Sequence, residues 1–168
     1  MEINAQEIRV ESGKRHISGL GGWLMLVQIG LYLTIVLSLR QLVTYNFDIL
    51  ASEYWTLLTS RDSEFYHPLW GPVIIFETIY NISLIAYVVF ILVHFYRRKR
   101  IVPALMIIFY AGSMLAGMLD FILLQMIPLA REAEDGSSNR DIFRSIVTCL
   151  IWIPYFLRSA RVRNTFVN

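Results

Sequence analysis

Residues 70–90, WGPVIIFETIYNISLIAYVVF, form the apolar run that decides the fold class. A bilayer core about 30 Å thick is crossed by roughly 20 apolar residues in an α-helix, and this run has that length. It nevertheless contains a carboxylic acid, Glu77, and an amide, Asn81. An ionisable group at membrane depth costs about 3 kcal/mol on insertion scales, so Glu77 needs a structural or functional reason.

The composition agrees with a membrane protein. Of the 168 residues, 56% are hydrophobic and 17% are charged, whereas about a quarter of the residues of a soluble domain are charged. The apolar stretches leave no segment long enough for a second core, which predicts one domain. The single cysteine, Cys149, rules out an intramolecular disulfide.

Four segments are apolar over nearly the length of a membrane span, and they predict an all-α fold: an integral membrane four-helix bundle. The first of these segments is longer than the usual apolar core of a signal peptide, and no cleavage site follows it. We therefore expect it to remain in the protein as a transmembrane helix. The expected organisation is an N-terminal tail at 1–18, a transmembrane domain at 19–158 with helices near 20–39, 69–95, 102–127 and 142–157, and a basic C-terminal tail at 159–168.

Basic residues cluster in segments that this threading places on one side of the membrane. Cytoplasmic loops carry the excess of Lys and Arg, so both termini are predicted to be cytoplasmic. The loop cluster and the C-terminal cluster either bind anionic lipid headgroups or act only as topology signals. The basic clusters comprise Arg9, Lys14 and Arg15 in the N-terminal tail, Arg97, Arg98, Lys99 and Arg100 in a loop, and Arg158, Arg161 and Arg163 near the C-terminus.

The loop on the opposite side after the first helix is long for a connector. Phe47, Leu50, Tyr54 and Leu57 recur at helical spacing, and Asp48 is a candidate N-cap. We expect a short amphipathic helix in the outer interface of the membrane.

Glu77 has a counterpart at similar depth in the third segment. Glu77 lies about 10 Å below Trp70, and Asp120 lies about 10 Å from the outer end of its own helix, at 1.5 Å per residue. Tyr80 and Asn81 share the face of Glu77. The residues of the predicted polar centre are Glu77, Tyr80, Asn81, Asp120, Arg40 and Arg144.

Three interpretations of this polar centre remain open. It is a polar clasp that fixes helix packing, or a site such as a proton-linked carboxylate pair, a cation site or a hydrophilic cavity, or a surface for a partner membrane helix. The sequence has no recognisable nucleophile motif or paired metal-ligand motif, so we expect no catalytic residue, no metal site and no cofactor.

Several blocks resemble one family. They are GLGGWLMLVQIGLYL, YHPLWGPVIIFETIYN, the aspartate Asp120, and IWIPYFLRSARVRNTFV. Together they resemble the bacterial inner-membrane family Domain of Unknown Function 2569. The resemblance implies four membrane helices and an inner-membrane location, and it brings no reaction. The matching positions are Gly21, Gly22, Trp23, Pro68, Leu69, Trp70, Glu77, Trp152, Pro154, Tyr155, Phe156, Arg158, Ser159, Arg161, Val162 and Phe166.

These features lead to two functional hypotheses. The first is a non-enzymatic accessory, assembly or envelope-maintenance factor that acts through helix association with a membrane-protein partner or another copy of itself. The alternative is a small transporter or ion-linked channel that uses the polar centre around Glu77 and Asp120. Neither involves nucleic acid.

Overall fold

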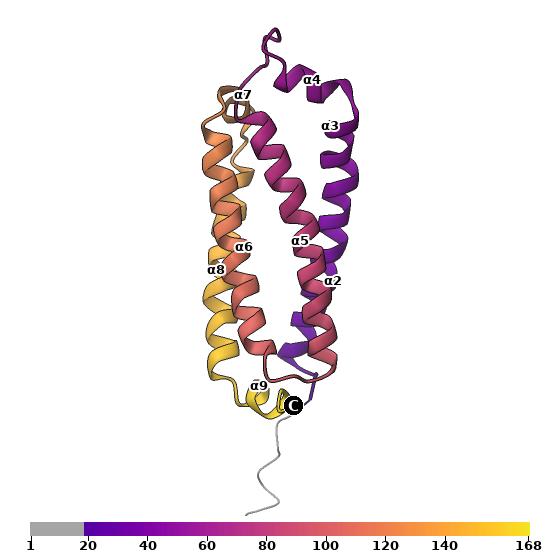
Figure 1. Ribbon diagram of the computed structural model, residues 1–168. Coiled ribbons are helices and arrows are strands. Elements are labelled where there is room, and N and C mark those ends of the chain that lie inside the picture. The colour runs from indigo at the N-terminus through magenta and orange to yellow at the C-terminus, as the bar shows by residue number, and fades with distance from the viewer. Residues whose placement is uncertain (1–18) are drawn as a thin grey trace, which may run out of the picture.

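The computed structural model describes residues 19–168, and every regular element in that range is helical (Figure 1). Its long helices are α2 (Trp23–Gln41), α5 (Trp70–Tyr96), α6 (Val102–Gln125) and α8 (Ser137–Arg158). They run side by side along the long axis of the molecule. The segments Trp23–Ala51, Trp70–Tyr96 and Val102–Gln125 are long and apolar enough to cross a membrane. The predicted all-α membrane fold is therefore confirmed with three candidate spans among the described residues.

The first helix is longer than predicted. It does not end near Leu39 but continues from α2 through a π-helical segment, η1 (Leu42–Asn46), into α3 (Phe47–Ala51). Polar side chains end the apolar run after Leu39, yet no glycine or proline follows to break the helix. Loss of hydrophobicity was therefore a poor marker of the helix end.

The first helix ends before Ser52, where the backbone is extended with φ −108° and ψ 175°. The Ser52 hydroxyl accepts a hydrogen bond from the Tyr54 N–H at 3.3 Å and so caps α4 (Glu53–Thr59). The expectation that Asp48 is the N-cap was wrong, because Asp48 lies inside α3. A short helix does occupy the predicted loop, and its position in the membrane interface stays a prediction.

The start of α8 is fixed by carboxylates that precede it. After α7 (Pro128–Ala133), Gly136 adopts the left-handed conformation with φ +85°. Glu134 then accepts a hydrogen bond from the Ser138 N–H at 3.0 Å, and Asp135 accepts one from the Ser137 N–H at 2.9 Å. These acceptors satisfy N–H groups that have no partner within the helix, so α8 begins at Ser137 and not near Ile142.

The hydrophobic core gathers at the end of the bundle that holds Gly19 and Asn168, called the terminal end below. Side chains from α2, α5, α6, α8 and the C-terminal segment meet there. This end is therefore the tightly packed half of the molecule. The buried residues of the cluster are Leu24, Val27, Leu31, Val88, Ile91, Leu92, Phe95, Val102, Leu105, Met106, Phe156, Val162 and Phe166.

The C-terminal segment closes the terminal end. Residues 159–168, treated above as a basic tail, contain α9 (Ala160–Thr165), which folds back under the helices (Figure 1). The Thr165 hydroxyl accepts a hydrogen bond from the Gly19 N–H at 2.9 Å, and Arg161 donates one to the Gly21 carbonyl at 3.0 Å. A Cβ at Gly22, where φ is +63°, would lie 3.3 Å from the Arg161 guanidinium. The glycines therefore allow the arginine to approach the backbone.

The loop between α5 and α6 joins the same closure. Arg100 donates hydrogen bonds to the carbonyls of Asn168 at 2.7 Å and Val167 at 2.6 Å. The Phe166 ring packs on Phe95 with ring centroids 5.2 Å apart. The C-terminal segment, and the Gly19–Gly22 segment bonded to it, are thus held against the hairpin formed by α5 and α6.

We predict that Phe166→Ala lowers thermal stability. The side chain is 4% exposed, and removing a buried phenylalanine typically costs about 3–5 kcal/mol. The control is Val167→Ala, since Val167 is 48% exposed. Thermal unfolding of the purified protein in detergent measures both. Equal melting temperatures for the two variants would show that this segment does not pack on the core.

Candidate functional site

The two carboxylates singled out from the sequence are in contact. Glu77 on α5 and Asp120 on α6 lie close enough for their carboxyl groups to interact with each other. The Asn81 side chain, on the same helix face as Glu77, donates to the Glu77 backbone carbonyl at 3.0 Å and not to its carboxylate. Tyr80, one turn after Glu77 on α5, lies close to Ser113 of α6 and lines the same cavity. The structure therefore joins Glu77 and Asp120 and leaves Asn81 a local partner of the backbone.

A third member, Asn46, was missed by the sequence analysis. Its side-chain amide donates a hydrogen bond to the Glu77 carboxylate at 3.4 Å, and the residue is 1% exposed. Asn46 ends the π-helical segment η1, and such wide turns are frequent at functional sites. Asn46 could have been found from the absence of any helix breaker between Leu39 and Ala51, which keeps it on the first helix.

The predicted arginine partners do not reach the carboxyl pair. The Arg40 side chain is exposed on α2. Arg144 forms an ion pair with Asp141 on its own helix, with a nitrogen–oxygen distance of 3.3 Å. Neither arginine therefore neutralises Glu77 or Asp120 in this structure.

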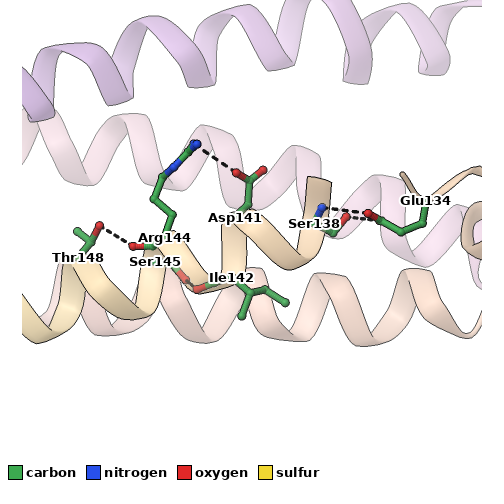
Figure 2. A network of polar contacts seen from close by, with 7 residues as sticks. All are labelled: Glu134, Ser138, Asp141, Ile142, Arg144, Ser145 and Thr148. Carbon is green, nitrogen blue, oxygen red and sulfur yellow. Dashed lines mark hydrogen bonds and ion pairs between the residues drawn. The ribbon is translucent and has the colours of Figure 1, made fainter. Parts of the chain in front are cut away.

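Arg144 and Asp141 instead face a cavity of about 520 Å³. Figure 2 shows both side chains leaving α8 toward the purple and magenta helices, and residues of α2 and α5 do line the cavity. The polar lining residues are Thr34, Tyr80, Ser113, Asp141, Arg144, Ser145 and Thr148. The apolar lining residues include Leu26, Leu31, Leu84, Phe109, Met114 and Trp152.

The polar face of α8 has a simple pattern that was available in the sequence. Arg144 and Ser145 lie three and four residues after Asp141, Thr148 lies three or four residues further on and Trp152 four after that, and all five line the cavity. The sequence analysis picked out only Arg144. The hydroxyls of Ser145 and Thr148 donate to backbone carbonyls of their own helix, at 2.7 and 2.8 Å (Figure 2).

A smaller cavity of about 200 Å³ lies between α6 and α8 and reaches the carboxyl pair. Asp120 lines it together with Ser138 and Phe121. Ser113, Asp141 and Ser145 line both cavities. The two cavities are therefore neighbours, with Asp120 on the smaller one and Arg144 on the larger one.

Glu134 and Asp135 stand apart from this region, at the start of α8. The Ser138 hydroxyl donates a hydrogen bond to the Glu134 carboxylate in addition to the bond from the backbone (Figure 2). These bonds lower the pKa of the Glu134 carboxyl, and the Ser137 contacts lower the pKa of Asp135 in the same way. Both carboxylates act on helix structure and lie outside the cavity lining.

The basic residues proposed as lipid contacts fall into two groups. Arg100 and Arg161 are engaged with backbone carbonyls at the terminal end, as described above. The others are exposed there, and their contact with lipid stays a prediction; they are Arg97, Arg98, Lys99, Arg158 and Arg163. Within residues 19–168, no group of three or more His, Cys, Asp and Glu side chains is placed to hold a metal ion.

Comparison with known proteins places the chain in a family. The family described as "Protein of unknown function (DUF2569)" matches residues 17–167. The chain is also 28% identical over 149 residues to "Inner membrane protein YdgK" of Escherichia coli (strain K12), an alignment that covers 89% of this chain and 94% of that protein. No solved structure matches it. The resemblance found in the sequence is thus confirmed, and the chain belongs to DUF2569, a family of membrane proteins whose function is unknown.

Proposed function

We propose that α8 crosses the membrane together with α2, α5 and α6, completing a four-helix bundle. At 1.5 Å per residue its 22 residues span about 33 Å, which matches the bilayer core. Its charges lower its average hydropathy; Asp141 and Arg144 line the cavity, and their side chains are 70% and 79% exposed. The opposite face is apolar, with Phe143 and Leu150 each 69% exposed. Such a helix suits a position where only one face meets lipid.

The bundle is further proposed to lie in the bacterial inner membrane with its terminal end in the cytoplasm. The E. coli relative is named as an inner-membrane protein. The exposed basic residues of the α5–α6 loop and of α9 lie at the terminal end, and cytoplasmic segments carry such residues. The loops at the other end contain the acidic residues Glu53, Asp62, Glu64 and Glu132.

Reporter fusions test this topology. Alkaline phosphatase fused after Asn168 is expected to be inactive, and green fluorescent protein at the same position is expected to fluoresce. Fusion of the phosphatase after Gly136 should give an active enzyme, because the α7–α8 loop is predicted to be periplasmic. Phosphatase activity at Asn168 would contradict the fourth span.

The activity that the geometry supports best is binding of a small amphipathic molecule within the bundle, as in a small transporter. The observation that carries this proposal is the Asp141–Arg144 ion pair facing the cavity of about 520 Å³. Ligand sites of proteins are typically about 300–1,000 Å³ in volume, mostly apolar, with a few convergent polar groups. Here the guanidinium of Arg144 would bind an anionic group, and Leu84, Phe109 and Trp152 would contact an apolar portion.

The accessory-factor hypothesis receives no comparable support. The exposed apolar side chains of α2 and α5 are those that any bundle presents to lipid, so they do not identify a partner helix. An enzymatic role is also not proposed, because the cavity holds charged and hydroxyl groups without an arrangement of nucleophile and base.

Arginine substitutions test ligand binding. We expect the wild-type protein, released from membranes directly into a native mass spectrometer, to retain a non-protein adduct that Arg144→Gln loses. Arg140→Gln is the matched control, because Arg140 is exposed on the same helix and does not line the cavity. Equal adducts in both variants would place the binding elsewhere, and a wild type without any adduct would contradict the proposal.

A further inference from the structure

The contact between Glu77 and Asp120 brings two acidic groups together in the apolar part of the molecule without a cation. Within the described part of the chain, the ion pair joins Arg144 to Asp141, and Arg40 is exposed away from the pair. Two ionised carboxylates in contact repel each other, and the repulsion is strong where water is scarce. A shared proton removes this repulsion, because one carboxyl group then donates an O–H···O hydrogen bond to the other.

Asn46 supplies an independent observation at the same place. Its amide nitrogen is bonded to the Glu77 carboxylate, while its side-chain oxygen Oδ1 has no partner and the residue is 1% exposed. The Oδ1 oxygen of Asp120 is likewise buried without a partner. Buried polar atoms are normally paired, and orphaned acceptor oxygens point to a missing donor. A proton shared by the two carboxyl groups would provide an O–H donor for the Asp120 oxygen.

We propose that Asn46, Glu77 and Asp120 form a proton-binding site, in which one proton is held between the two carboxyl groups and the Asn46 amide donates to Glu77. The proton comes from water and returns to water, with no other bond made or broken. The site draws on three elements, η1, α5 and α6. It is separate from the ligand cavity and does not depend on what that cavity binds.

The surroundings give this proton a route to water. Asp120 borders the cavity of about 200 Å³, which Ser138, Asp141 and Ser145 also line. Among ionisable and charged groups nearby, Asp141 on α8 shares this cavity with Asp120, and Tyr80 on α5 and Arg144 on α8 line the neighbouring larger cavity. Arg144 neutralises Asp141 through their ion pair, so the pair on α5 and α6 remains the group that needs a proton.

Dicyclohexylcarbodiimide is a suitable probe because it is apolar and reacts with carboxyl groups that carry a proton. Membranes that contain the full chain are treated near neutral pH, and the modified residue is identified by peptide mass spectrometry. We expect modification at Glu77 or Asp120, falling as the pH is raised, and none at exposed carboxylates such as Asp48. Absence of modification at the pair would overturn the proposal.

Three variants sharpen this test. Glu77→Gln and Asp120→Asn each give the remaining carboxylate an N–H donor in place of the shared proton, so each is expected to lose the modification at the remaining acid. Asp48→Asn is the matched control and should leave it unchanged. If the remaining acid is still modified in either variant, the two carboxyl groups do not share a proton. Protection by Na⁺, Mg²⁺ or Ca²⁺ at constant ionic strength would instead assign the site to a metal cation.

Discussion

The requirement that polar groups at membrane depth find partners inside the protein governs the half of the bundle away from the terminal end. Glu77 meets Asp120 and Asn46, and Arg144 meets Asp141. Asn46, Glu77 and Asp120 turn inward from helices that also face lipid, whereas the side chains of Arg144 and Asp141 are 79% and 70% exposed beside the larger cavity. The remaining surface of these helices is then free to be apolar. One physical constraint thus accounts for both the polar interior and the apolar exterior.

The two halves of the molecule are built differently. The terminal end is packed with apolar side chains and closed by α9, the Gly19–Gly22 segment and the α5–α6 loop. The other half contains the cavities and the hydrogen bond from Asn46 to Glu77. The proposed ligand binding requires the helices around the cavity to adjust while the packed terminal end keeps the bundle folded.

Sequence patterns predicted those parts of the structure that depend on local hydrophobicity. The bounds of α5 and α6 were close to the predicted ones, because each run of apolar residues ends at charged or turn-forming residues. Contact between Glu77 and Asp120 followed from equal depth on two helices. The continuation of the first helix to Ala51 did not follow, since polar residues such as Arg40 and Asn46 end the hydrophobic run without ending the helix.

Other features depend on contacts between distant residues, which single-helix patterns do not record. The sequence placed Arg144 in the polar centre with Glu77 and Asp120, yet Asp141 lies one turn away and is reached at lower entropic cost. The C-terminal segment was treated as a tail because it is basic. Its apolar residues Val162 and Phe166 are in fact buried, and Arg161 finds backbone carbonyl partners in the glycine segment.

Spin-label scanning of α8 from position 140 to position 152, in liposomes and in a Cys149→Ser background, tests the central claim most directly. The account predicts that collisions with a water-soluble relaxation agent and with oxygen both vary with a period of about 3.6 residues and in opposite phase. Labels at 141, 144, 145 and 148 should favour the water-soluble agent, and labels at 143, 147 and 150 should favour oxygen. In-phase variation along α8 would mean that the helix lies in a single solvent, water or lipid, and would contradict the account.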